Sequence, residues 1–510
     1  MNTNAAPVPA PSSGDLVTNV IMVGILAAVI LIYFLNNPLK HSRDFKIRCF
    51  FNWFPLGLTY AFLYMARYNL TVAKSSLGDL ISNQSFGDIF GIGSVVYGCA
   101  FLINGPMTEK IGGKKAIMIG SAGSLIMNIL MGCALYSALN GGLAVQTLVT
   151  AFMILYALNM YFQSFGAVAV VKVNSHWFNI KERGVLGGIF GTLISLGLFY
   201  AFNWGDMIVE ASRAVPSPNI GVLEQALRAL LHINGTVDQI WYVFFIPAFI
   251  LLVFFFIIMF AVKDSPEEAG FPAFDLGDAS ETEEGSQNLE GLALMKKLLT
   301  NPIILTIASI EFCSGILRQS VMHWYKLFVH HFGTMPQYAS SFSAANFFCD
   351  NWGLLLCFAG ILGGMCAGFI SDKLFGSRRG PSAVLLYAVM LVCVIALVFC
   401  LRDNQLAVGV IMMVMSLCVI GVHGMLSGTA TMDFGGKKAA ATATGLVDGF
   451  VYLGTGFQAF ALGRITSMGA NEQLAWSSGW SYWPVFMIPF AIVGLILSIK
   501  IWKAFPGAKK

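Results

Sequence analysis

Charged residues are scarce in this sequence. They make up 11% of its 510 residues, whereas a typical soluble domain contains about 25%. Hydrophobic residues make up 57% of the chain. So little charge excludes an ordinary soluble globular protein, and so much apolar sequence predicts a polytopic protein built from membrane-spanning helices.

Clusters of reactive or metal-binding residues are also missing. The ten cysteines are scattered, mostly in apolar stretches, without the spacing of a zinc site or of a disulfide framework. The sequence contains no nucleophile and base pattern and no glycine-rich nucleotide loop. We therefore expect neither an enzyme nor a cofactor or metal site, and we interpret the cysteines as small packing residues.

Apolar stretches of about 20 residues have the length of a helix that spans a bilayer. The sequence predicts an all-α membrane protein with twelve such helices and one extra helix at the N-terminus. The thirteen stretches are residues 16–35, 51–75, 88–108, 115–137, 143–171, 185–204, 240–262, 302–326, 352–371, 381–401, 405–430, 440–462 and 481–502.

Lys and Arg residues are concentrated in every second connection between these stretches, for example at Lys114, Lys172 and Lys373, and in the C-terminal tail. The positive-inside rule places those connections and the C-terminus in the cytoplasm. The net charge of +4 therefore reflects topology, and no nucleic-acid partner is indicated. Two arginines, Arg67 and Arg318, remain inside apolar stretches, where a charge costs roughly 3 kcal/mol on insertion scales.

The apolar stretches divide into an N-terminal segment and two larger halves. Residues 1–48 combine a Pro/Ser-rich leader, expected to be disordered, with the extra helix. Basic residues follow that helix instead of preceding it, which favours a retained helix over a cleaved signal peptide. An acidic cytoplasmic linker at 263–300 separates two domains of six spans each, 49–262 and 301–510. The NGT triplet at 234–236 matches a glycosylation acceptor, which is weak evidence on its own.

A loop motif recurs at corresponding places in the two halves, as in an internal repeat. GPMTEKIGGKK at 105–115 and GFISDKLFGSRRG at 368–380 each follow the second helix of their half. An acid at the helix end that pairs with basic residues of the next loop would lock two helices on the cytoplasmic side. The alternative is that these charges only set the topology. The gating motif is assigned to Gly105, Glu109, Lys110, Asp372, Lys373, Arg378 and Arg379.

Further stretches carry a resemblance to a known family. They are YMARYNLTVAKSSL at 64–77, LNMYFQSFGAVAVVKVNSHWFNIKERG at 158–184, DSPEEAGFP at 264–272, ILRQSVMHW at 316–324 and MLSGTATMDFGGKKAAATATG at 425–445. With the loop motifs, they resemble the major facilitator superfamily and, within it, the organophosphate:inorganic-phosphate antiporter family. The resemblance covers the chain from Phe51 onward and implies the fold of that superfamily, two six-helix halves related by a pseudo-two-fold axis.

In that family an arginine on the first helix of each half binds the substrate phosphate, and the matching residues are Arg67 and Arg318. The residues themselves indicate the same pair, because these are the only basic side chains left in the membrane interior. Guanidinium groups donate paired hydrogen bonds to phosphate and stay charged. A snorkelling or helix-pairing role is the alternative.

Four polar residues near the arginine of the first half also match the family motifs. Tyr60 and Tyr64 precede Arg67 by seven and three residues, so they share its helix face. Asn159 and Gln163 are spaced i, i+4 on a later helix. All four are predicted to line the substrate site. The alternatives are packing for the tyrosines and hydrogen bonds to a neighbouring helix for the amides.

Two positions depart from the family pattern and two acids stand out. Phe101 replaces a usual lysine and Ile194 a usual histidine, so the substrate and the coupling stay open. Glu311 and Asp448 lie within helices of the second half, where a carboxylate must pair, here with the arginines, or be protonated. We hypothesise that at least one of them titrates during transport; a static ion pair is the alternative. His423 is interpreted as a packing histidine.

The favoured function is secondary transport by rocker-switch alternating access. The substrate is a small anionic phosphorylated metabolite, a sugar phosphate or glycerol 3-phosphate, and the exchange for inorganic phosphate follows from the resemblance. The alternative is a membrane sensor for hexose phosphate with little transport, in which the N-terminal helix docks a partner protein. A drug or cation exporter is disfavoured by the two buried arginines. The expected location is a bacterial inner (plasma) membrane.

Overall fold

The computed structural model describes residues 14–179, 182–218, 220–233, 236–272, 298–333, 335–338, 340–376, 378–430, 440–468 and 478–503. Four predicted features lie partly or wholly outside these ranges. They are the leader before the first helix, most of the linker, two residues of the NGT triplet and the end of the C-terminal tail.

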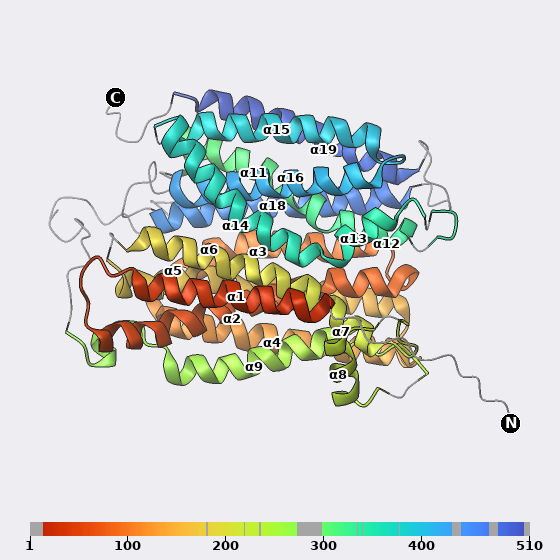
Figure 1. Cartoon of the computed structure of the whole chain (residues 1–510), viewed down its shortest axis with the longest axis horizontal. Coiled ribbons are helices and arrows are strands. Elements are labelled where there is room, and N and C mark those ends of the chain that lie inside the picture. Colours follow the sequence, from red (N-terminus) through yellow and green to blue (C-terminus); the bar gives the residue numbers. More distant parts are fainter. Residues whose placement is uncertain are drawn as a thin grey trace.

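A helix lies at each of the thirteen predicted stretches (Figure 1). These helices are α1 (Gly14–Leu35), α2 (Arg43–Leu77), α3 (Asn83–Ile111), α4 (Gly113–Leu139), α5 (Val145–Trp177), α6 (Arg183–Phe199), α9 (Tyr242–Ala261), α11 (Pro302–Met322), α14 (Trp352–Phe369), α15 (Arg379–Cys400), α16 (Gln405–His423), α18 (Ala440–Ser467) and α19 (Tyr482–Lys500). By length and composition, eleven helical segments of the described chain are able to cross a membrane; α2 and α18 fall outside that group.

Shorter segments extend or connect these helices. The π-helices η2 (Tyr200–Trp204), η5 (Ile370–Leu374) and η6 (Gly424–Ala430) continue α6, α14 and α16, while α7 (Gly205–Ser212) and α12 (Trp324–Gly333) continue the chain after η2 and α11. Two more short helices, α8 (Val222–Leu230) and α13 (Ser343–Asp350), lie in connections. The remaining short turns are η1 (Gly78–Leu80), η3 (Glu267–Ala269) and η8 (Gly479–Ser481).

The local sequence explains where several helices begin. Ser42 and Ser82 precede α2 and α3, and each side chain accepts a hydrogen bond from a backbone N–H of the first turn. Asn301 does the same for α11, with Pro302 at the first helical position. Such caps satisfy amide groups that the helix itself leaves without partners.

The helices that precede the linker and those that follow it pack against each other over a broad interface (Figure 1). Helix α3 lies against α18, and α6 lies against α14. Glycines allow the first of these contacts to be close. A Cβ atom on Gly87 would lie 2.8 Å from the Cα of Gly463, and one on Gly98 would lie 2.8 Å from the carbonyl oxygen of Gly449. Small residues at such positions let membrane helices approach closely.

Helix α1 is attached at both of its ends. Near its start, Asn19 accepts a 2.8 Å hydrogen bond from the indole nitrogen of Trp204. At its C-terminal end, Lys46 Nζ donates to the carbonyl oxygens of Tyr33 (2.6 Å) and Asn36 (2.7 Å). A lysine at a helix C-terminus satisfies carbonyls that have no partner within the helix. The extra helix is therefore an ordered part of the fold.

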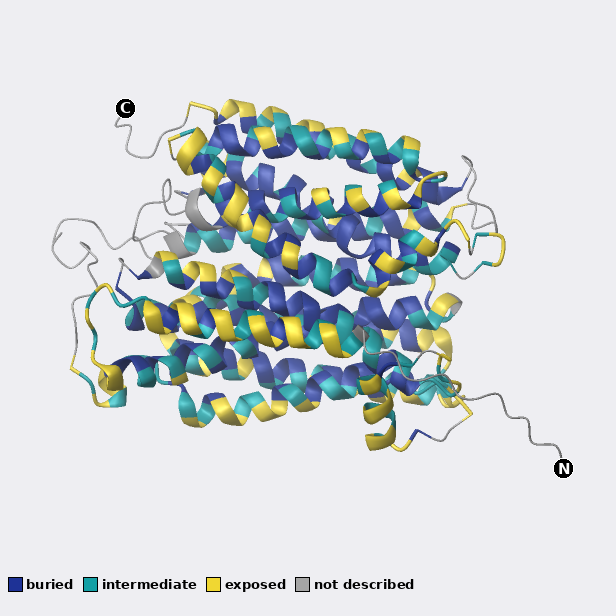
Figure 2. Ribbon diagram, viewed as in Figure 1, coloured by how far each residue is buried: buried dark blue, intermediate teal, exposed yellow. Residues whose placement is uncertain are grey.

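The outer face of α1 is apolar and exposed, as the yellow positions along this helix show (Figure 2). Val17, Val23 and Leu35 are 56%, 67% and 75% exposed. Exposed apolar side chains on so many helices are expected where lipid tails, not water, surround a protein.

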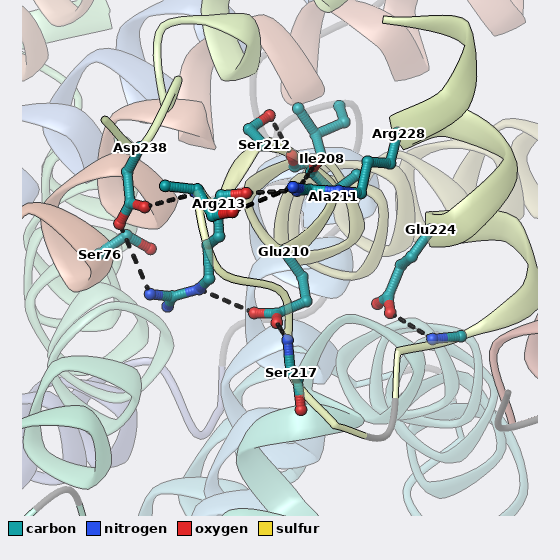
Figure 3. Close-up of polar contacts among 12 residues, drawn as sticks. Ser76, Ile208, Glu210, Ala211, Ser212, Arg213, Ser217, Glu224, Arg228 and Asp238 are labelled. Carbon is teal, nitrogen blue, oxygen red and sulfur yellow. Dashed lines mark hydrogen bonds and ion pairs between the residues drawn. The ribbon is translucent and has the colours of Figure 1, made fainter. Parts of the chain in front are cut away.

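Charged residues organise the loop between α7 and α9 (Figure 3). Arg213 Nε lies 2.8 Å from a Glu210 carboxylate oxygen, and its Nη1 lies 3.9 Å from an Asp238 oxygen. Arg228 donates to backbone carbonyls at the end of α7. Both arginines therefore hold this connection in place through ion pairs and backbone contacts.

Candidate functional site

Arg67 lies within α2 and is fully buried. Its guanidinium group donates three hydrogen bonds to other helices. Nε donates to Gln163 Oε1 on α5 (2.9 Å), Nη1 to the Tyr452 hydroxyl on α18 (2.8 Å) and Nη2 to the Tyr97 hydroxyl on α3 (3.0 Å). All three partners are neutral, so they satisfy the donors without cancelling the charge.

Aromatic rings surround the same guanidinium group. Its Cζ lies 4.4 Å from the ring centroid of Tyr97, 4.8 Å from that of Tyr64, 5.7 Å from that of Tyr452 and 5.9 Å from that of Tyr68. A cation within about 6 Å of an aromatic face is stabilised by the ring quadrupole. The tyrosines thus offset part of the cost of burying Arg67.

A network of amide and hydroxyl groups positions Gln163. Its Nε2 donates to Ser124 Oγ on α4 (3.1 Å) and to Asn159 Oδ1 one turn earlier (3.2 Å). Asn159 in turn donates to the carbonyl oxygen of Ala66 on α2 (3.1 Å). Gln163 therefore contacts the arginine directly, whereas Asn159 joins neighbouring helices, which was the alternative for these amides.

Arg318 lies on α11, at the corresponding place in the second half. Its Cζ lies 5.8 Å from the centroid of the same Tyr452 ring. The buried Nε of Arg318 has no hydrogen-bond partner among the residues that the structure describes. Within those residues, neither Arg318 nor Arg67 forms an ion pair. The predicted pair thus meets around one tyrosine, with two positive charges and no carboxylate partner.

The other predicted tyrosine lies further from the charge. Tyr60 packs edge-on against Tyr64, with ring centroids 5.4 Å apart. Phe101, at the position where the family usually has a lysine, packs edge-on against Tyr97 (4.8 Å) and lies 6.3 Å from Tyr452. Phe101 therefore packs against two of the tyrosine rings that surround Arg67.

Among the described contacts, the two acids of the second half form no ion pair with the arginines, which was the alternative to titration. Glu311 Oε2 lies 2.9 Å from His423 Nδ1, because α16 brings that histidine against α11. Asp448 accepts a hydrogen bond from the Ser427 hydroxyl. His423 is consequently a partner of a buried carboxyl group and more than the packing residue that the sequence indicated.

The gating motif follows the prediction in one half only. Asp372 Oδ1 lies 3.1 Å from Arg379 Nη1, an acid paired with a basic residue that follows the loop. Glu109 instead pairs with Lys172, near the C-terminal end of α5. Lys114, one of the two basic residues that begin α4, donates its side chain to the carbonyl oxygen of Met259 instead (2.7 Å).

The remaining motif residues make weaker contacts. A Cβ atom on Gly105 would have no neighbouring atom within 4 Å, so the space beside this residue is open. Arg378 donates from Nε to the carbonyl oxygen of Phe375 (3.1 Å). Lys110 and Lys373 are exposed. Gly105, Lys110, Lys373 and Arg378 therefore belong to the predicted gating motif but make no described contact between the two halves.

Two ion pairs that the sequence did not predict do join the halves. Lys326 Nζ on α12 lies 2.6 Å from Asp206 Oδ2 on α7, and the lysine side chain is only 3% exposed. Arg464 Nη1 on α18 lies 2.8 Å from Asp88 Oδ1 on α3. Both pairs lie at the helix ends away from the linker. No sequence signal links these residues, because the partners are far apart along the chain.

Comparisons with known proteins agree with this architecture. A family model described as Major Facilitator Superfamily matches residues 56–459. The chain belongs to the major facilitator superfamily. Its helices also align with a crystal structure titled as a bacterial homolog of the human lysosomal transporter Spinster in an inward-facing and occupied conformation. That likeness has a TM-score of 0.63 and 13% identity, and it covers 91% of this chain and 98% of the other.

Curated relatives confirm the narrower resemblance to the organophosphate antiporter group. A probable hexose phosphate transport protein of Chlamydia trachomatis is 23% identical over 91% of this chain and 92% of its own length. A glycerol-3-phosphate transporter of Bacillus subtilis is 24% identical, over 87% and 90% of the two chains. The membrane sensor protein UhpC of Escherichia coli is 23% identical, over 80% and 84%. The protein is thus a multi-pass membrane protein of a transporter family.

Proposed function

We propose that this protein exchanges a phosphorylated organic metabolite, a sugar phosphate or glycerol 3-phosphate, for inorganic phosphate. The observation that carries the proposal is the pair Arg67 and Arg318, which face one tyrosine from two halves without a carboxylate partner among the described residues. Such a site favours a compact dianion, because two guanidinium groups offer both charge and paired donors. The names of two relatives, a hexose phosphate transport protein and a glycerol-3-phosphate transporter, support the same substrate class.

The hydrogen bonds of Arg67 indicate how a phosphate enters the site. Each tyrosine hydroxyl that accepts a bond from Arg67 keeps its own proton. That proton is free to bond a phosphate oxygen, so Tyr97 and Tyr452 contribute donors beside the arginines. Gln163 keeps the guanidinium plane fixed while the anion binds. The substrate-binding set that we propose is Arg67, Arg318, Tyr64, Tyr97, Tyr452 and Gln163, with Tyr60 and Asn159 supporting it.

Exchange requires that the site open to one side at a time. We take residues 49–262 and 301–510 as the two rocking bodies and 263–300 as their connector, in a bacterial inner membrane with the C-terminus in the cytoplasm. The pairs Lys326–Asp206 and Arg464–Asp88 hold the halves together at the side away from the connector. Outward opening then needs both pairs to break, whereas the Asp372–Arg379 pair acts within the second half.

The test uses the purified full chain in liposomes loaded with inorganic phosphate. Uptake of labelled phosphate, glycerol 3-phosphate and glucose 6-phosphate is measured for the unmodified protein and for Arg67→Lys, Arg318→Lys and the control Arg228→Lys. Exchange that both site variants abolish and the loop variant retains supports the proposal. Exchange that survives in either site variant contradicts the assigned site, and no exchange contradicts transport.

A sensor function is the second candidate, because one relative is named a membrane sensor protein. Its site chemistry would be the same, and the N-terminal helix would serve a partner protein. The liposome assay separates the two functions when it is combined with equilibrium binding. Hexose phosphate binding without exchange favours the sensor, and rapid exchange favours the carrier.

A further inference from the structure

Glu311 is a carboxyl group buried deep in the second half. Its side chain has no exposed surface, and it lies on α11 seven residues before Arg318. One oxygen, Oε2, contacts His423 Nδ1 at 2.9 Å. The other oxygen, Oε1, has no hydrogen-bond partner among the described residues. Burying a carboxyl group without hydrogen bonds costs more for the charged form than for the neutral form.

His423 connects this buried group to the accessible surface of the molecule. Its side chain is 26% exposed, while that of Glu311 is not exposed at all. It is the last residue of α16, where the π-helix η6 begins. A histidine that contacts both a buried acid and an accessible surface is suited to pass a proton between them.

Other polar groups around the pair set its electrostatic environment. On α11 these are Arg318 and the thiol of Cys313; on α18 it is Asp448, which accepts from Ser427. From α15 the Tyr387 hydroxyl donates to the backbone of α11 at Ile310, 2.7 Å away. Arg318 lies two helical turns from Glu311 on α11. An anion that neutralises the charge of Arg318 therefore changes the electrostatic environment of Glu311.

The spacing along α11 is short enough for that influence. Seven helical residues rise about 10 Å. Opposite charges at that distance attract each other more strongly inside a protein than in water. Without an anion, a charged Glu311 is stabilised by Arg318. A phosphate that binds Arg318 removes this stabilisation and favours a protonated Glu311.

We propose that Glu311 and His423 form a proton-binding pair that takes up a proton when an anion binds between Arg67 and Arg318. The inference rests on the proposed function and adds that a proton is coupled to binding of the transported anion. The proton enters from bulk water through His423 and resides on the Glu311–His423 pair, and it leaves when the anion leaves. Because linkage is reciprocal, protonation of the pair strengthens anion binding by the same factor.

The experiment measures proton uptake on addition of inorganic phosphate to the purified full chain in nanodiscs. A pH-sensitive dye in weakly buffered solution reports the protons, and labelled phosphate reports binding. Variants are Glu311→Gln, which resembles the protonated acid, His423→Gln, and Asp403→Asn as an exposed carboxyl control. Subtracting the Glu311→Gln signal cancels the titration of phosphate itself.

We expect the unmodified protein and Asp403→Asn to take up roughly one more proton per bound phosphate than Glu311→Gln. As the pH rises, their phosphate affinity should fall more steeply than that of Glu311→Gln, by up to about tenfold per pH unit. Glu311→Gln should bind phosphate at least as well as the unmodified protein. Equal proton counts in these proteins would overturn the proposal. A His423→Gln profile identical to the unmodified one would remove His423 from the pair.

A ligand-free measurement separates failure of this inference from failure of the proposed function. Infrared difference spectra between acidic and alkaline pH detect the carbonyl band of a protonated carboxyl group. If no phosphate binds but a titrating band disappears in Glu311→Gln, the proposed function fails and the proton site stands. If the unmodified protein lacks that band, Glu311 does not titrate and the inference fails.

Discussion

The two arginines of the site have different surroundings, although they occupy corresponding helices. Arg67 in the first half donates three hydrogen bonds and lies among four tyrosine rings. Arg318 in the second half contacts one of those rings and has a buried Nε without a described partner. The first half presents a prearranged cation, and the second half presents one whose partners a ligand can supply.

The same difference extends along the helices that carry them. On helix α11, five side chains have a buried atom that lacks a described hydrogen-bond partner: Glu311, Ser314, Arg318, Gln319 and Ser320. On α2 there are three: Asn52, Trp53 and Asn69. Around Arg67 the amides of Gln163 and Asn159 bond each other and their neighbours. Buried polar groups are nearly always satisfied in folded proteins. If an anion binds as proposed, we expect α11 to change its contacts more than α2.

The largest expected effect comes from replacing each arginine by lysine. Both variants should lose phosphate exchange by about 100-fold or more, because paired charged hydrogen bonds to the anion are lost. Arg67→Lys should also unfold at lower temperature, since it leaves buried partners unsatisfied, at a cost of about 2 kcal/mol. Arg318→Lys should leave the unfolding temperature nearly unchanged. Equal unfolding temperatures for the two variants would contradict the view that Arg67 is held by its partners more firmly than Arg318.

The next effect distinguishes the glutamines beside the arginines. Gln163→Leu removes the acceptor of Arg67 Nε and a partner of Ser124, so we expect a loss of about 1–3 kcal/mol in stability. Gln319→Leu removes only a 3.5 Å contact to the Tyr68 hydroxyl and should cost less than Gln163→Leu. Denaturation in detergent measures both. A larger loss in Gln319→Leu would show that the second half is the more rigid one.

A smaller effect is expected from single hydroxyl groups. Tyr452→Phe keeps the ring that both arginines face and removes the hydroxyl that accepts from Arg67. We expect phosphate affinity to fall about tenfold, the value of one hydrogen bond to a charged group. Tyr64→Phe keeps the ring that contacts Arg67, so it should change the affinity less than Tyr452→Phe, by under threefold or about 0.6 kcal/mol. Tighter binding by Tyr452→Phe would mean that its hydroxyl competes with phosphate.

The smallest effect is expected at the ion pairs of the two loop motifs. Asp372→Asn and Glu109→Gln each remove an exposed acid, and exposed pairs contribute about 1 kcal/mol or less. We expect Asp372→Asn to change the exchange rate more, because Asp372 pairs with a basic residue of its own motif, whereas Glu109 pairs with Lys172 outside its motif. Initial exchange rates measure this. Equal rates would assign both motifs to topology alone.

The sequence predicted the helices well, because long apolar stretches and the basic residues in alternate connections are visible directly in the order of residues. It also grouped Arg67, Arg318 and Gln163; the structure places Gln163 against Arg67 and both arginines near Tyr452, while their binding role stays a prediction. It missed Tyr97 and Tyr452, since a tyrosine in an apolar helix has no signal that separates packing from contact with a cation. The partners of Glu311 and Glu109 were missed for a related reason. Which helix lies opposite a residue depends on tertiary packing, and spacing along one helix does not contain it.

The most direct test of the account is a cryo-electron microscopy structure of the full chain with bound glycerol 3-phosphate or inorganic phosphate. The account predicts density for a phosphate group between the guanidinium groups of Arg67 and Arg318, within hydrogen-bond distance of both and of the Tyr452 hydroxyl. Density for the ligand elsewhere, with Arg67 still bonded only to Gln163, Tyr97 and Tyr452, would contradict it.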